Sequence, residues 1–149
     1  DVNDISDVTA FCVSAYDKED GHVIVSPIDV DKARGGVYMS RPLPVGARLR
    51  MTEFGRDDIL QGSRRGARMA VDSFPGHRGP ELALLFSCTS RKQILGTRVT
   101  EEVEELRSAL PPGTPFFGFY TYGEFGPGEA GKNCKQYDSA FLPVVLGEK

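Results

Sequence analysis

Hydrophobic and polar residues alternate along much of the chain with the period of two that is typical of β-strands. The alternation is clearest at 47–54, where ARLRMTEF places apolar side chains on one face and arginines on the other. Other short apolar runs predict strands at 8–17, 22–28, 36–42, 81–90, 116–126 and 139–147. The polar turn KEDG makes the first two a hairpin, and the nearly unbroken apolar run at 81–90 predicts a strand buried on both faces.

A period of three to four residues marks two segments as helices. The first runs to about residue 72, with Asp57 or Asp58 as the expected N-cap. The second begins with Thr100 as its expected cap, and a Pro-Pro-Gly sequence after Leu110 ends it.

The first helix has two unlike faces. Gly62 and Gly66 each weaken it by about 1 kcal/mol relative to alanine, and we interpret them as letting the helix lie close to a sheet. The opposite face carries a basic cluster formed by Arg64, Arg65 and Arg68. Such a cluster can bind phosphate, but a solvated helix face is the simpler interpretation.

The order of these elements predicts an α+β fold. Strands joined through helices favour parallel neighbours and the terminal hairpins favour antiparallel ones, so we expect a mixed β-sheet with two main helices packed on one face. The polar residues 1–7 look like a linker from an upstream domain, and residues 8–149 form one domain. Because the first residue is Asp1, we expect the chain to be a piece of a longer protein.

Composition removes several classes of function. The net charge of −3 gives no general attraction to nucleic acid, no apolar run is long enough to span a membrane, and no signal-peptide pattern opens the given sequence. Three scattered cysteines favour a reducing, cytoplasmic setting over a disulfide framework. His22 and His77 stand in no metal-ligand spacing with a cysteine, so we expect no metal site. The common nucleotide and hydrolase motifs are absent.

The segment FFGFYTYGEFG, at 116–126, combines aromatic residues, glycines and a single carboxylate. Strand alternation puts Phe117 and Phe119 on a face that we expect to be core. The other face carries Tyr120, Tyr122 and Glu124, which together suit a pocket wall. Gly118 and Gly123 would leave clearance beside that wall. A half-exposed sheet face with Glu124 in water is the alternative.

A second candidate region is FSCTSRK, at 86–92. Cys88 and Ser90 are expected to share a face of their strand, with Arg91 where that strand leaves the sheet. Arg91 could activate Cys88 as a nucleophile, although no histidine lies near in sequence to act as its base. A buried cysteine that packs as a small apolar residue is the alternative.

Taken together, PLPVGARLRM, ALLFSCTSRKQILG and FFGFYTYGEFGP resemble the C-terminal domain of FIST (F-box and intracellular signal transduction) proteins. The resemblance covers about residues 20–147. It implies a sensory domain that binds a small ligand, proposed to include amino acids, beside an N-terminal FIST domain. It also implies an output module such as a histidine kinase, a cyclic-dinucleotide enzyme or a chemotaxis receptor.

The resemblance also assigns site residues. The matching positions are Cys88 and Arg91 in the first motif and Tyr120, Tyr122, Gly123 and Glu124 in the second. One position departs from the family: where relatives carry a Phe-His-Asn-like triplet, this chain reads Gln-Tyr-Asp at 136–138. Some relatives are linked to haem, but that replacement and the turn and loop positions of His22 and His77 argue against haem here.

The main hypothesis is therefore a non-catalytic, ligand-binding sensory domain of bacterial signal transduction, without cofactor. Its predicted ligand-binding residues are Cys88, Ser90, Arg91, Tyr120, Tyr122, Gly123 and Glu124. We expect the strands that end at Arg91 and Glu124 to run parallel, so that the two charged side chains meet at one sheet edge. Two alternatives stay open: a small-molecule hydrolase that uses Cys88, Arg91 and Glu124, and an interaction module that docks its N-terminal partner half.

Overall fold

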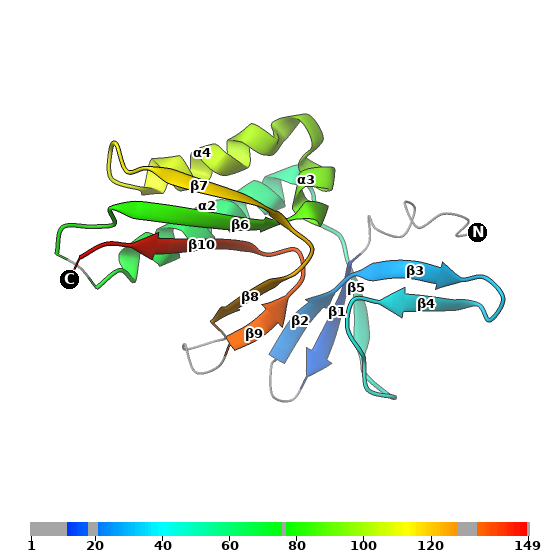
Figure 1. Cartoon of the computed structure of the whole chain (residues 1–149). Coiled ribbons are helices and arrows are strands. Elements are labelled where there is room, and N and C mark those ends of the chain that lie inside the picture. Colours follow the sequence, from blue (N-terminus) through cyan, green and yellow to red (C-terminus); the bar gives the residue numbers. More distant parts are fainter. Residues whose placement is uncertain (1–11, 18–20, 76, 128–133, 149) are drawn as a thin grey trace. The chain divides into compact units, whose positions relative to one another are not determined.

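The chain folds into two compact units, as seen in a computed structural model that describes residues 12–17, 21–75, 77–127 and 134–148 (Figure 1). The first unit combines Asp1–Glu53 with Phe125–Ser139, and the second combines Phe54–Glu124 with Ala140–Lys149. The backbone therefore passes from one unit to the other at three places along the sequence.

The first unit contains an antiparallel sheet of order β2-β1-β5. Strands β1 (Cys12–Asp17) and β2 (Gly21–Val25) form the predicted hairpin, with Val13 opposite Val25. Strand β5 (Leu49–Thr52) pairs with the other edge of β1 and confirms the strand predicted at 47–54.

Two further hairpins in this unit lie only partly in the strands that the sequence predicted. Strand β3 (Pro27–Asp31) pairs with β4 (Gly36–Met39), and the Asp31 carboxylate accepts hydrogen bonds from two backbone amides of the turn between them. Strand β8 (Glu124–Pro127) pairs with β9 (Cys134–Tyr137), although the pattern at 126–137 predicted only a loop. Strand β4 falls within the strand predicted at 36–42, whereas residues 29–31 of β3 and the whole of β9 were missed. Short polar strands carry little hydrophobic periodicity, which explains these omissions.

The second unit contains the mixed sheet. Strand β6 (Leu82–Cys88) lies at its centre, antiparallel to β10 (Phe141–Leu146) and parallel to β7 (Phe116–Thr121). This sheet and its helices confirm the predicted α+β class. The parallel β6–β7 pair also confirms the expectation that these two strand ends emerge at the same edge.

The helices of this unit differ from the prediction mainly at their ends. Helix α2 (Arg56–Asp72) has Gly55 as its N-cap, and Asp58 instead accepts a hydrogen bond from the Gly55 amide at 2.8 Å from within the first turn. Thr100 is likewise not a cap, because α4 (Val99–Ala109) begins before it. Between β6 and α4 the chain forms α3 (Thr89–Leu95) and a 3-10 turn, η1 (Gly96–Arg98), where no helix was predicted.

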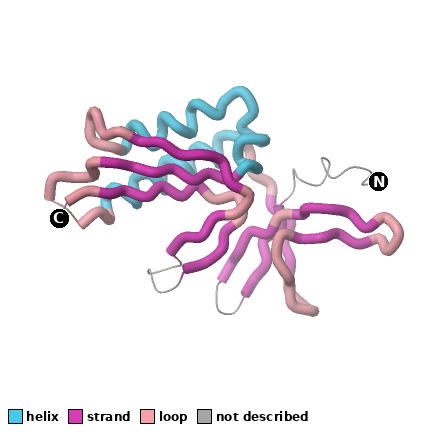
Figure 2. Tube along the Cα trace, in the orientation of Figure 1, coloured by secondary structure: helices cyan, strands magenta, loops and turns pink. Residues whose placement is uncertain are grey.

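Helices α2 and α4 cover one face of the mixed sheet (Figures 1 and 2). The core between them is built from Ala67, Ala83, Leu85, Leu106 and Leu110. A Cβ on Gly66 would lie 3.3 Å from the Phe141 ring, so this glycine does allow the close approach that was expected. The arginines of α2 point to solvent, and Arg64 pairs with Glu105 at 2.7 Å. No helix in the described segments has the length and apolar character needed to span a membrane.

The opposite face of the mixed sheet is apolar and largely uncovered within this unit, which contradicts two expectations. Strand β6 is buried on one face only, because its alternate residues Leu84 and Phe86 are half-exposed. Phe117 and Phe119, expected in the core, are each 63% exposed. They pair with Leu84 and Phe86 across the sheet and share their outward direction, whereas Phe116 packs on the helix side.

Candidate functional site

The candidate site begins at the end of β6, where helix α3 places the side chain of Arg91 in the protein interior. Arg91 is buried and donates from Nε to the Glu102 carboxylate of α4 at 2.7 Å. Its Nη2 donates to the Ser63 hydroxyl at 2.6 Å and to the Ile59 carbonyl at 3.0 Å, both on α2. The arginine thereby ties α2, α3 and α4 together.

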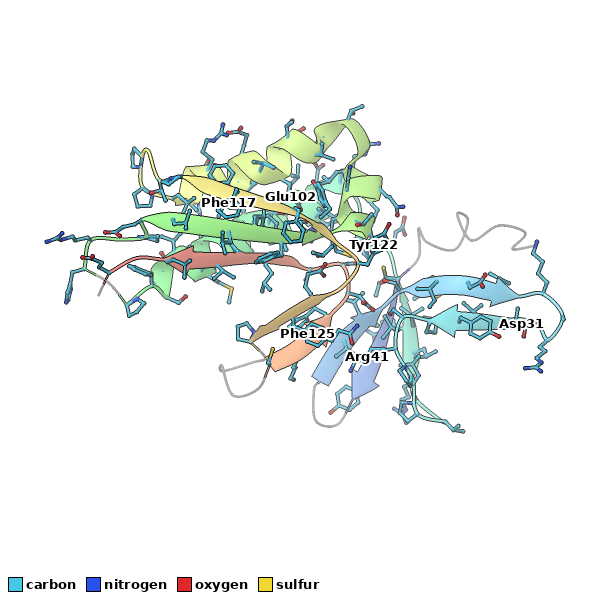
Figure 3. All side chains as sticks on the ribbon, in the orientation of Figure 1. Asp31, Arg41, Glu102, Phe117, Tyr122 and Phe125 are labelled. Carbon is cyan, nitrogen blue, oxygen red and sulfur yellow. The ribbon has the colours of Figure 1, made fainter. Side chains whose placement is uncertain are left out.

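Glu102 is the centre of this polar cluster and has no exposed surface. Besides Arg91, it accepts hydrogen bonds from Ser63 at 3.1 Å and from Ser87 on β6 at 2.9 Å. Figure 3 labels Glu102 on α4, at the helix side of the sheet. Every buried side-chain nitrogen and oxygen among the described residues has a partner, so the cluster is a fully satisfied network.

Tyr120 extends the cluster to β7. Burial raises the pKa of the Tyr120 phenol, and the nearby Glu102 carboxylate raises that pKa further. Arg91 acts in the opposite direction on the pKa because its positive charge favours the phenolate. The Lys92 ammonium lies over the ring of Tyr120, 5.3 Å from its centre.

A cavity of about 270 Å³ adjoins this polar cluster, between β7 and α4. It is lined by Leu85, Ser87, Val103, Phe116, Phe117, Gly118, Phe119 and Tyr120. Its walls are therefore mainly apolar, and the hydroxyl groups of Ser87 and Tyr120 supply polarity at one end. A concave apolar space with a few hydrogen-bonding groups is the usual form of a small-ligand site.

Gly118 has a local reason to be a glycine. A Cβ at this position would lie 1.9 Å from the carbonyl oxygen of Leu85, its partner on β6. The clearance that we assigned to a ligand is thus taken up by the neighbouring strand. Gly118 is required by backbone packing, independently of any ligand.

Two predicted residues, Cys88 and Glu124, lie near the ends of β6 and β7 instead of in the cavity lining. Glu124 is only 2% exposed; it accepts hydrogen bonds from the Thr121 hydroxyl and, at 3.3 Å, from the Ala140 amide. The Cys88 amide donates to the Ala140 carbonyl at 3.0 Å, so Cys88 and Glu124 flank the same residue. This arrangement places Glu124 in the interior and excludes the open-water alternative.

Ser90 and Tyr122 are not where strand alternation put them. Ser90 lies in α3, not on the strand face of Cys88, although its hydroxyl is 3.1 Å from the Cys88 sulfur. The strand ends at Thr121, and Tyr122 and Gly123 form a bend before β8. Tyr122 is consequently 93% exposed (Figure 3) and does not share a strand face with Tyr120 and Glu124.

Of the seven predicted residues, only Tyr120 lines the cavity. Arg91 pairs with Glu102 and not with the expected Glu124. Glu102 was missed, but a signal for it exists. It precedes Leu106 by four residues, which puts a carboxylate on the buried stripe of α4. A charge in that position requires a buried partner of opposite sign.

The described residues offer no metal centre. No group of three or more His, Cys, Asp and Glu side chains comes together in this part of the chain. All three cysteines are thiols, and His77 is exposed in a loop. In the Gln-Tyr-Asp segment at 136–138, where the chain departs from the family pattern, the Tyr137 hydroxyl donates to the Pro127 carbonyl at 2.9 Å. The Asp138 carboxylate accepts a hydrogen bond from the Ser40 hydroxyl.

Comparison with known proteins gives one family. No curated protein and no solved structure matches the chain. The model of the FIST C domain matches residues 3–127, most of the sequence, and so includes β6, the buried Arg91–Glu102 cluster and β7. The chain therefore belongs to the FIST C domain family, a family associated with signal transduction and not a known enzyme family.

Proposed function

We propose that this domain is a sensory domain of bacterial signal transduction that binds a small metabolite in the cavity beside β7. The observation that carries the proposal is the cavity itself, which joins apolar walls to a buried polar cluster. The ligand we propose is a small amino acid or related metabolite. The signal would pass to an output module, such as a kinase, a cyclic-dinucleotide enzyme or a chemotaxis receptor, with an N-terminal FIST domain in the same protein.

The size and chemistry of the cavity restrict the ligand. At about 270 Å³ it lies just below the range of roughly 300–1,000 Å³ that drug-sized ligands occupy. A suitable ligand has a compact apolar body and one end that hydrogen-bonds to Ser87 or Tyr120. Arg91 and Glu102 already bind one another, so their contribution is to hold Ser87 and Tyr120 in place.

The burial of the strand-end residues supports binding without turnover. Both oxygens of Glu124 accept hydrogen bonds from Thr121 or Ala140, and the Cys88 thiol is buried. A hydrolase that used Cys88, Arg91 and Glu124 would need these groups to reach a substrate. Product formation from a panel of amides and imines that vanished in Glu124→Gln would overturn the non-catalytic proposal.

A thermal-shift screen of the protein against amino acids and related metabolites tests the main proposal. A ligand at a hundred times its dissociation constant adds about 2.7 kcal/mol to the free energy of unfolding, which raises the unfolding midpoint measurably. We expect at least one compound to do so. We expect Val103→Phe, which fills the cavity from α4, to abolish the shift while the protein stays folded.

Met69→Phe is the matched control, because Met69 lies exposed on α2 and lines no part of the cavity. This variant should respond to the ligand like the wild type. A screen without any stabilising compound contradicts ligand binding. An undiminished shift in Val103→Phe places the ligand elsewhere.

A second candidate function, docking of the N-terminal partner half, is favoured by the uncovered apolar face of the mixed sheet. Phe117 and Phe119 on β7 lie beside Leu84 and Phe86 on β6, and Val144 on β10 is also exposed. Sedimentation at rising concentration tests whether this face associates. Self-association that Phe119→Lys removes and the control Met69→Lys leaves unchanged would support docking, whereas a monomer at all concentrations would contradict it.

A further inference from the structure

Strand β7 is the outermost strand of the mixed sheet, and its outer edge carries no paired strand among the described residues. The order is β10-β6-β7, so β6 occupies only one side of β7. Figure 2 shows β7 at the border of this sheet next to the helices. An edge strand presents a row of backbone N–H and C=O groups that another extended segment can pair with.

The cavity beside β7 extends along this edge strand on the helix side of the sheet. It touches five consecutive residues of the strand, from Phe116 to Tyr120. Side chains on one face of a strand alternate, so a cavity on a face would contact only every second residue. Contact with five consecutive residues shows that the cavity reaches beyond one face to the backbone of β7. Its part on the helix side of the sheet is lined by Leu85 and Ser87 of β6 and by Val103 of α4.

A strand added at this edge would meet apolar surface on both of its faces. Its alternate side chains would enter the cavity toward Leu85 and Val103. The remaining side chains would extend the outer face of the sheet beside Phe117 and Phe119, each 63% exposed. The added segment must therefore be apolar at successive positions and not only at every second one.

Two cations stand at the two ends of this edge. The Arg107 guanidinium lies 5.4 Å from the centre of the Phe116 ring, at the start of β7, where it also pairs with Glu104. Lys92 lies 5.3 Å from the centre of the Tyr120 ring, near the end of the strand. An antiparallel second copy of β7 would bring Lys92 close to Arg107 of the other copy and place like charges together. A segment with acidic ends fits instead.

We infer that the outer edge of β7 accepts an extended peptide segment of another protein as a fourth strand of the mixed sheet. The segment is a run of about five apolar residues with acidic residues at both ends, because about five residues match the length of the edge. Its inward side chains fill the cavity to which the proposed function assigns the metabolite, so peptide and metabolite compete. Peptide binding is measured without metabolite, which keeps the two proposals separable.

The test uses the peptide acetyl-EEVLVFVEE-amide, labelled for fluorescence anisotropy, with the whole 149-residue chain. We expect saturable binding, and slower hydrogen exchange at the β7 amides in the complex. A copy N-methylated at alternate apolar residues keeps its side chains but cannot complete the backbone ladder. We expect it to bind at least about tenfold more weakly, because several backbone hydrogen bonds are lost.

The role of the two cations beside the ends of β7 is tested with Lys92→Glu and Arg107→Glu. Each substitution should weaken peptide binding and reduce the dependence of that binding on salt. Arg65→Glu on the exposed face of α2 makes the same charge change away from β7 and should leave binding unchanged. Equal affinity of the N-methylated peptide, or no saturation at millimolar peptide, overturns the inference. Protection of the β7 amides that rises with protein concentration in the absence of peptide assigns the edge to a second copy and also overturns it.

Discussion

At the scale of single residues, Gly118 sets how closely β7 approaches the centre of the sheet. The hydrogen that replaces its side chain points at the backbone of Leu85, where a carbon atom would lie 1.9 Å from the carbonyl oxygen. A backbone atom cannot turn away as a flexible side chain can. Any larger residue must therefore separate β7 from β6.

Gly118→Ala should lower the free energy of unfolding by at least about 3 kcal/mol, because one methyl group is forced against a fixed strand. Urea denaturation followed by circular dichroism measures the loss. Gly62→Ala on α2 is the control, since a Cβ there meets nothing within 4 Å and should stabilise the helix by about 1 kcal/mol. Similar effects of the two substitutions would contradict this account of Gly118.

Tyr120 gives the protein a pH dependence at the alkaline end. Its pKa in the folded state is raised by burial and by Glu102, so the folded state holds the phenol proton more tightly than the unfolded chain. This stability is fully present below the unfolded value, near 10. It is lost as pH rises through the folded pKa.

Tyr120→Phe should remove that contribution. The stability difference between wild type and Tyr120→Phe is expected to shrink above about pH 10, where unfolded tyrosine ionises. Denaturation curves across the alkaline range measure the difference. Tyr122→Phe is the control because Tyr122 is 93% exposed. A difference that did not change with pH would contradict a raised pKa at Tyr120.

At the scale of elements, α2, α3, α4 and β6 each contribute one side chain to the buried cluster of Ser63, Ser87, Arg91 and Glu102. The four elements can pack around an ion pair only if every partner is in position. Such a cluster adds less to stability than an apolar core of the same size, but it fixes which surfaces of the helices face one another.

Arg91→Met should cost about 3–5 kcal/mol, because it leaves the Glu102 carboxylate buried without its cation. The double variant Arg91→Met with Glu102→Leu should recover much of that loss. Arg107→Met is the matched control, since the Arg107–Glu104 pair is exposed on both sides and should contribute less than about 1 kcal/mol. Chemical denaturation of the four proteins provides the measurement, and equal losses for Arg91→Met and Arg107→Met would be incompatible with this cluster.

Among the elements, hydrophobic periodicity predicted those with long apolar stripes and missed those without them. The strands and helices with long apolar stripes, such as 57–72 and 81–90, were found with small errors at their ends. The β8–β9 hairpin and α3 were not, since their residues lack a clear stripe and depend on pairing with distant segments. These missed elements caused the main errors in the predicted site. One missed bend at Tyr122 and one missed helix at Ser90 changed the direction of the side chains that follow, and Arg91 turned from Glu124 toward Glu102.

At the scale of the whole molecule, the two units differ in how they are held together. Both hydrophobic clusters of the described residues fall within Phe54–Glu124 and Ala140–Lys149, around Ala67 and Leu106 and around Ile59 and Leu95. The β3–β4 hairpin of the other unit instead exposes Ile28, Val37 and Tyr38. Few buried contacts allow local opening at low cost.

Native-state hydrogen exchange should therefore separate the units. The amides of β6 and α2 are expected to exchange slowest, at rates set by global unfolding, and those of β3 and β4 fastest. Mass spectrometry of peptic fragments from 27–39 and from 82–88 measures both. Equal protection of the two fragments would mean that the chain unfolds as one cooperative body.

The position of β10 along the chain has a consequence for biosynthesis. Strand β6 needs β10 on one side, yet Phe141–Leu146 follows Leu82–Cys88 by more than fifty residues, and both β8 and β9 are made in between. A nascent chain that has reached β9 thus holds an apolar β6 with one side still open. Translation arrest or a premature stop in this interval would release a chain with an exposed edge, the kind of species that aggregates or is captured by chaperones.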